Sequence, residues 1–125
     1  MERAVRVLAV DDEPSVTLSL GYILDRPRYE TVAVSDGDAA LTKLDTDPVP
    51  FDIIIVDQIM PHLSGIKLVQ EIRKRGIPGK IILISAHLSA EICASYEGEN
   101  VQVLLNKPFD VEILRRTVDR LMRES

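Results

Sequence analysis

Five short runs rich in valine, isoleucine and leucine recur along this chain, and longer stretches separate them. The runs lie at residues 5–10, 31–34, 53–56, 81–84 and 101–105. They are largely apolar from end to end, which is typical of strands in a sheet that is covered on both faces. Such a sheet needs a helix after each strand, so the pattern predicts a parallel α/β sandwich with right-handed crossovers.

The stretches between the runs have the features of helices. Residues 14–24 place four apolar side chains on one face, namely Val16, Leu20, Ile23 and Leu24. A similar stripe near the C-terminus consists of Val111, Leu114, Val118 and Leu121. Residues suited to cap helices stand where four helices are expected to begin: Asp36, Ser64, Ser89 and Asp110. The whole pattern predicts one doubly wound (βα)5 domain, and 125 residues is a common size for a single domain.

Composition argues against several classes of function. A net charge of −5, with no lysine- or arginine-rich run, disfavours direct nucleic-acid binding. Every apolar run is far shorter than the roughly 20 residues that cross a bilayer, so no membrane segment is expected. Cys93 is the single cysteine, which excludes an internal disulfide and favours a reducing, cytoplasmic location.

Residues that suit phosphate or metal chemistry follow four of the five runs. They are Asp11 and Asp12 after the first run, Asp57 after the third, Ser85 after the fourth and Lys107 after the fifth. Taken singly, each is also explained as a surface loop residue or a helix cap. In open α/β sheets, however, the site lies beyond the carboxyl ends of the strands. The shared position therefore predicts a functional site at that edge.

The three aspartates indicate what this site does. If the first and third strands are neighbours, the carboxylates of Asp11, Asp12 and Asp57 converge. Two such charges about 5 Å apart repel by roughly 3 kcal/mol at an effective dielectric constant near 20, and Mg²⁺ is a hard cation that offsets this repulsion. An aspartate is also a recognised nucleophile for phosphoryl groups. Asp57 stands alone on the central strand, and Ser85 and Lys107 suit the remaining phosphoryl oxygens.

Four segments carrying these residues resemble the response-regulator receiver domains of two-component systems, the CheY-like group. The segments are residues 11–14, 57–65, 85–86 and 106–109, in the family's order and approximate spacing. The resemblance covers the whole chain and implies a flavodoxin-like fold with a five-stranded parallel sheet of order 2-1-3-4-5. It also implies that residues 1–125 form one receiver domain, with no output domain in this chain.

The resemblance assigns roles to the site residues. Asp57 is the expected phosphoacceptor. Asp12 binds Mg²⁺ directly, Asp11 acts mainly through a water molecule, and Asp57 and the backbone carbonyl of Ile59 complete the protein ligands.

Two further roles follow from the same resemblance. Ser85 is the expected switch hydroxyl that moves to meet the phosphoryl group. Lys107 pairs with the phosphate and is held by a Lys107–Pro108 peptide bond that is cis in similar domains.

The resemblance also implies a function and partners. A sensor histidine kinase or a histidine phosphotransfer protein donates a phosphoryl group to Asp57. The change alters the face formed by the fourth helix, fifth strand and fifth helix, which a downstream effector or a fused output domain reads. A phosphorylation-dependent homodimer is compatible with this scheme. The chain is not an enzyme in the ordinary sense, because it catalyses only its own phosphorylation and dephosphorylation.

Three positions depart from the family pattern or tune it. Leu104 stands where the family often has an aromatic residue that swings inward. Ile59 is apolar where the family often has a polar side chain, which predicts slow attack by water and a long-lived phosphoryl group. His87 either tunes that lifetime or is simply a partly exposed residue near a helix start.

Two other classes of function stay open. A Mg²⁺-dependent phosphohydrolase usually needs a second acid beside the nucleophile and a cap over the substrate. Gln58 and Ile59 supply no acid, and 125 residues leave no room for a cap. An adaptor that keeps the fold without being phosphorylated is compatible with Leu104, but the complete set of site residues argues against it.

Overall fold

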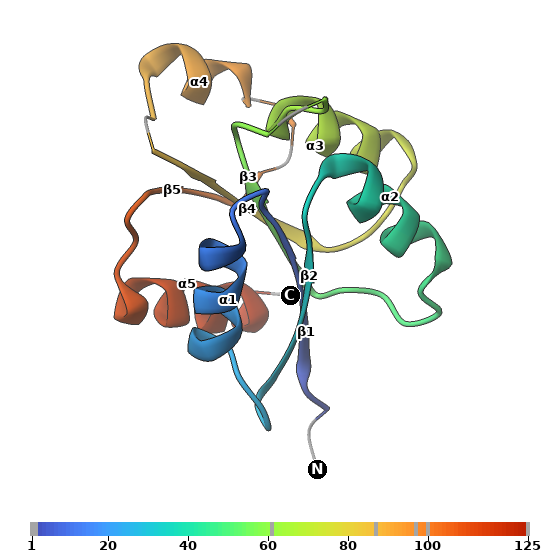
Figure 1. The fold of residues 1–125 in the computed structure, drawn as a ribbon, viewed down its shortest axis with the longest axis vertical. Helices are drawn as coiled ribbons and strands as arrows, with labels where there is room; N and C mark the ends of the chain where they lie inside the picture. Colours follow the sequence, from blue (N-terminus) through green and yellow to red (C-terminus); the bar gives the residue numbers. More distant parts are fainter. Residues whose placement is uncertain (1–2, 61, 87, 97, 100, 125) are drawn as a thin grey trace.

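The computed structural model describes residues 3–60, 62–86, 88–96, 98–99 and 101–124. Over these residues, strands and helices alternate along the chain (Figure 1). The strands are β1 (Val5–Val10), β2 (Tyr29–Val34), β3 (Ile53–Asp57), β4 (Lys80–Ser85) and β5 (Val103–Asn106). The helices are α1 (Pro14–Ile23), α2 (Gly37–Thr46), α3 (Gly65–Lys74), α4 (Ala90–Ser95) and α5 (Val111–Arg123). Neighbouring strands are parallel in the order β2-β1-β3-β4-β5, which confirms the predicted fold class and strand order.

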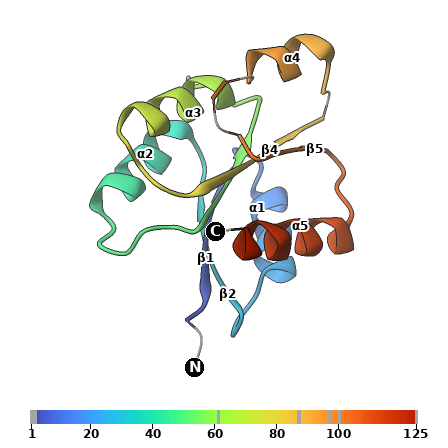
Figure 2. The ribbon, with the colours of Figure 1, turned by 180° about the vertical axis from the view of Figure 1, so that it is seen from behind.

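Helices cover both faces of the sheet. Helices α1 and α5 pack on one face, and α2, α3 and α4 lie on the other (Figures 1 and 2). Alternate residues of the central strand β3 divide between the two cores. Ile53 and Ile55 belong to the core under α1 and α5, whereas Ile54 and Val56 belong to the other core. Because β3 has no solvent-facing side, its sequence is apolar until the final residue, Asp57.

Two strands begin two residues away from the predicted start, and the other strand boundaries differ from the prediction by one residue at most. β2 begins earlier, at Tyr29, which already pairs with Val5 of β1. β5 begins at Val103 and not at residue 101. The side-chain oxygen of Gln102 accepts the Ile81 N–H at 2.7 Å. The backbone N–H of Gln102 donates to the Ile81 carbonyl at 3.0 Å, so Gln102 binds Ile81 through both its side chain and its backbone just before β5 begins.

Most of the predicted caps are correct. Three of them accept backbone N–H groups of the first helical turn at 2.7 to 3.1 Å: Asp36, Ser89 and Asp110. Ser64 lies at the N-cap of α3, but its side chain makes no capping hydrogen bond. The N–H of Gly65 instead donates to the carbonyl of Gln58 at 3.0 Å. The start of α3 is therefore tied to the loop that follows β3.

Helix α5 buries one side only. In α5, Leu114, Val118 and Leu121 are buried as predicted, but Val111 at the first position is 43% exposed. Thr117 lies on the inner side, and its hydroxyl donates within the helix to a carbonyl one turn earlier, at 2.7 Å. None of the helices in the described part of the chain has the length and apolarity needed to cross a membrane.

Candidate functional site

The predicted site residues meet at one edge of the sheet. The strand order places β1 and β4 on either side of β3, and the parallel direction brings their carboxyl ends together. Asp57 is the last residue of β3 and Ser85 is the last residue of β4. Asp11 follows β1 directly, and Lys107 follows β5. Residues that are far apart in the sequence thus share one small region.

Three carboxylates form the centre of this region. Oxygen atoms of Asp11, Asp12 and Asp57 lie within 4.8 Å of one another. Asp11 is 1% exposed and Asp57 is 4% exposed, whereas Asp12 is open to solvent. Hard divalent cations such as Mg²⁺ favour a few carboxylate oxygens together with retained water molecules. The donor set therefore fits a magnesium ion, and Asp12 is the carboxylate of this set that is open to solvent.

Lys107 is the cation that faces this cluster. Its Nζ lies 2.9 Å from Oδ2 of Asp11 and 3.3 Å from Oδ1 of Asp57. Glu13 also approaches, with Oε1 at 3.5 Å from the same ammonium, a contact that sequence reasoning missed. One ammonium does not neutralise the cluster, so negative charge is left over. Like charges held together in this way favour the binding of a further cation.

The pKa values reflect this arrangement. The pKa of Asp57 is raised to about 6: burial is the main cause, the charge of Asp11 adds to it, and Lys107 and the backbone N–H of Ile59 oppose it. Burial lowers the pKa of Lys107, but its hydrogen bond and charge interactions with Asp11 and Asp57 outweigh burial and raise the pKa overall. At neutral pH, Asp57 is therefore mainly a carboxylate and Lys107 an ammonium.

Ser85 occupies a fully buried position at the end of β4. Its carbonyl accepts the backbone N–H of Lys107 at 2.8 Å, so the two residues are held side by side. The Lys107–Pro108 peptide bond is cis, as the resemblance implies.

The positions that depart from the family pattern are placed as follows. The side chain of Ile59 is 65% exposed, while its main chain contacts Asp57. Leu104 is partly buried and packs against the core under α2, α3 and α4. His87 lies outside the described residues, so its predicted influence is neither supported nor opposed. The predicted long phosphoryl lifetime stays a prediction.

Sequence reasoning also missed a contact beside Asp57. The hydroxyl of Tyr96, just after α4, donates to the side-chain oxygen of Gln58. Tyr96 is 4% exposed. A tyrosine after a short helix has many roles in proteins, so no sequence signal pointed to this contact.

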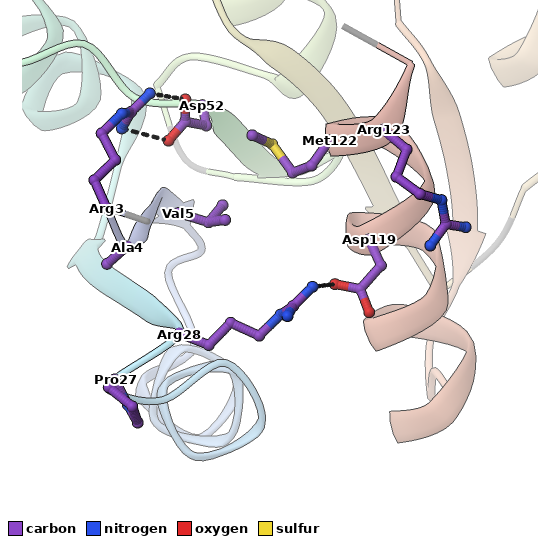
Figure 3. Close-up of a pocket in the computed structure, with 9 residues that line it drawn as sticks. All are labelled: Arg3, Ala4, Val5, Pro27, Arg28, Asp52, Asp119, Met122 and Arg123. Carbon is purple, nitrogen blue, oxygen red and sulfur yellow. Dashed lines mark hydrogen bonds and ion pairs between the residues drawn. The ribbon is translucent and has the colours of Figure 1, made fainter. Parts of the chain in front are cut away.

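A large cavity lies at the opposite edge of the sheet. It has a volume of about 760 Å³ and lies near the amino ends of β1, β2 and β3. Figure 3 shows Arg3 facing Asp52, and Arg28 reaching Asp119. Arg3 and Arg28 are each paired with a carboxylate, and Arg123 of α5 lines the same cavity. This cavity therefore holds arginines beside carboxylates and not a cluster of carboxylates.

A comparison with protein families agrees with this geometry. A family described as "Response regulator receiver domain" matches residues 7–119. The chain belongs to this receiver-domain family. Receiver domains are regulatory modules and not classical enzymes.

Individual relatives support the assignment of the receiver domain. The chain is 35% identical over 81 residues to the alkaline phosphatase synthesis transcriptional regulatory protein PhoP of Bacillus subtilis, and the match covers 65% of this chain. It is 31% identical over 121 residues to the sensor histidine kinase GacS of Pseudomonas protegens, covering 93% of this chain. The receiver domain spans only 33% and 13% of the lengths of these two relatives.

A solved structure shows the same fold. The chemotaxis protein CheY4 of Vibrio cholerae is 30% identical to this receiver domain, with a TM-score of 0.86. The match covers 96% of this chain and 99% of CheY4. The similarity therefore extends over the whole sheet and its surrounding helices.

Proposed function

We propose that this receiver domain is a phosphoacceptor switch of a two-component phosphorelay, in which Asp57 receives a phosphoryl group in the presence of Mg²⁺. The observation that supports it most directly is the buried Asp57 carboxylate, close to the carboxylates of Asp11 and Asp12 and 3.3 Å from the ammonium of Lys107. Buried like charges of this kind are costly to fold. A function in phosphoryl transfer accounts for their presence.

The transfer begins with the carboxylate of Asp57. One of its oxygens attacks the phosphorus atom of a phosphohistidine on a sensor kinase or phosphotransfer protein. The new P–O bond forms as the P–N bond breaks, and the electron pair of that bond stays on the imidazole nitrogen. The product is an acyl phosphate on Asp57.

Other residues stabilise the transferring group. Asp11, Asp12, Asp57 and the carbonyl of Ile59 are the proposed holders of Mg²⁺, which supplies positive charge to the phosphoryl oxygens. Lys107, which already pairs with Asp11 and Asp57, would offer a second positive charge to the phosphoryl oxygens.

Ser85 is the proposed sensor of the new group. Ser85 follows Ile84 of β4, which pairs with Asp57 of β3, and its hydroxyl would donate to a phosphoryl oxygen once one is present. The shift then alters the surface made by α4, β5 and α5, which an effector or an output domain reads. Relatives named as a sensor kinase and a transcriptional regulator are consistent with partners of these two kinds. In this scheme, the receiver domain catalyses only its own phosphorylation and dephosphorylation.

The test is incubation with acetyl phosphate and Mg²⁺, followed by intact-mass measurement. We expect the wild type to gain one phosphoryl group, and the gain to disappear in Asp57→Asn and when Mg²⁺ is chelated. Asp38→Asn is the matched control, because Asp38 is an exposed aspartate on α2, outside the cluster. A wild type that stays unmodified supports the adaptor alternative. A modification that survives Asp57→Asn contradicts the choice of acceptor.

A further inference from the structure

The α4 segment is attached to the rest of the molecule mainly at its end. None of the residues of α4 is buried, although Ile92 packs partly against the core. Tyr96, which follows the helix directly, is 4% exposed and belongs to that core. Figures 1 and 2 show α4 at the same end of the molecule as the beginning of α3. Tyr96 is thus the buried anchor of this segment.

The phenol of Tyr96 reaches the loop that carries the phosphoacceptor. Its hydroxyl donates to the side-chain oxygen of Gln58, the residue after Asp57. A Cβ atom added at Gly65 would lie 2.8 Å from the same hydroxyl oxygen and 2.7 Å from the Asp57 carbonyl. The Tyr96 hydroxyl thus lies in a space beside Asp57 that is open because residue 65 is a glycine.

Gln58 is held from three directions. Its backbone N–H donates to the Ile84 carbonyl on β4 at 2.9 Å, and its carbonyl accepts the Gly65 N–H of α3 at 3.0 Å. The third contact is the Tyr96 hydroxyl from the end of α4. Gln58 therefore connects β4, α3 and α4 at the position next to Asp57.

The hydroxyl of Tyr96 is suited to stay a donor. Burial, and then the negative charge of Asp57, raise the pKa of the phenol. The proton stays on the oxygen at every pH at which the domain would act. The dependence on Asp57 also means that a change of charge at the acceptor is felt by the phenol.

We propose that Tyr96 is a positioning residue that couples the acceptor loop to the α4 segment through its hydrogen bond with Gln58. The inference rests on the proposed phosphoacceptor function and names the route by which α4 responds. Such coupling is reciprocal. A ligand bound at the acceptor site alters the packing of α4, and a substitution that loosens α4 lowers the affinity for that ligand correspondingly. Leu104 on β5, where similar domains often have an aromatic residue, has no hydroxyl with which to make such a hydrogen bond.

The coupling is first tested without any ligand, by amide hydrogen exchange. Tyr96→Phe keeps the ring and removes one hydroxyl. We expect exchange in α4 and at the amides of Gln58 and Gly65 to quicken by about 2- to 10-fold, the range of one neutral hydrogen bond. Tyr29→Phe is the matched control, because Tyr29 is also buried and its hydroxyl donates to Asp119 at 3.0 Å. The control should leave α4 unchanged.

A double variant separates coupling from simple loss of packing. Gln58→Met removes the acceptor at similar length. If the two side chains act through their mutual bond, Tyr96→Phe combined with Gln58→Met should quicken exchange in α4 no more than the worse single variant. Additive effects, or an unchanged α4 in Tyr96→Phe, would overturn the inference.

The second test adds Mg²⁺ and beryllofluoride, a mimic of the phosphoryl group, and follows amide NMR signals. We expect the probe to change exchange in α4 of the wild type, and Tyr96→Phe to weaken probe binding by about 2- to 10-fold. If Tyr96→Phe binds the probe like the wild type with the same α4 response, the coupling is refuted. If the wild type binds no probe, the phosphoacceptor function fails, and the ligand-free exchange still decides the coupling.

Discussion

The two edges of the sheet handle charge in different ways. At the amino edge, two arginines pair with carboxylates: Arg3 forms two hydrogen bonds with Asp52 at 2.8 and 3.0 Å, and Arg28 pairs with Asp119. At the carboxyl edge, three aspartates face the single ammonium of Lys107. Matched pairs need no further partner. The unmatched cluster leaves negative charge that a bound cation would offset, and this difference separates the two edges more clearly than cavity volume does.

Among substitutions at the two edges, Lys107→Met is expected to change the stability of the fold most. Removing the ammonium leaves Asp11 and Asp57 buried beside each other without a cation. Such a change is expected to cost about 3 kcal/mol of unfolding free energy at pH 7. Urea denaturation at pH 7 and at pH 5 measures it, and the loss should shrink at pH 5 because Asp57, with a pKa of about 6, then takes up a proton. A loss that is equal at both pH values would contradict the explanation.

Asp57→Asn is expected to stabilise the fold while abolishing acceptance of the phosphoryl group. The pKa of Asp57 rises from 3.8 to about 6 on folding, so the folded state holds more protons between these values. The loss of stability caused by burying the Asp57 carboxylate is therefore absent below about pH 4, grows as the pH rises, and is complete above about pH 6. We expect a gain of about 1 to 3 kcal/mol at pH 7.

Denaturation across this pH range is the measurement for Asp57→Asn. The variant should show a flatter dependence of stability on pH than the wild type between pH 4 and pH 6. Lower stability than the wild type at pH 7 would mean that the pairing of Asp57 with Lys107 outweighs its burial.

Magnesium is expected to act at the carboxyl edge alone. At a concentration tenfold above its dissociation constant, Mg²⁺ should raise the unfolding free energy of the wild type by about 1.4 kcal/mol. Asp12→Asn should remove the effect without disturbing the fold, because Asp12 is exposed. Thermal denaturation with and without Mg²⁺ checks this, and Asp38→Asn serves as the unaffected control. An equal shift in Asp12→Asn would place the ion elsewhere.

The smallest effect is expected at the amino edge. Arg28→Ala breaks an ion pair with Asp119 in which the arginine side chain is largely exposed, and such pairs add little to stability. Its unfolding midpoint should stay close to that of the wild type, and any difference should fade as salt is added. A loss as large as that of Lys107→Met would remove the contrast between the edges.

The fold was largely predictable because its pattern is strong. β3 is buried on both faces, so its sequence is apolar until Asp57. The differences from the prediction are local. The side-chain oxygen of Gln102 accepts the Ile81 N–H just before β5, and Ser64 lies at the N-cap of α3 without a capping hydrogen bond.

The amino-acid order alone specifies which residues follow each strand, because the alternation of apolar runs and helices sets where each strand ends. It thereby predicts that Asp11, Asp57 and Lys107 share one site. How close these residues come, how deeply Asp57 is buried and why its pKa rises to about 6 all depend on the packing of the folded chain. The contact between Tyr96 and Gln58, 38 residues apart, likewise depends on how α4 packs against the acceptor loop. Burial and distance arise from packing, and a local pattern does not specify them.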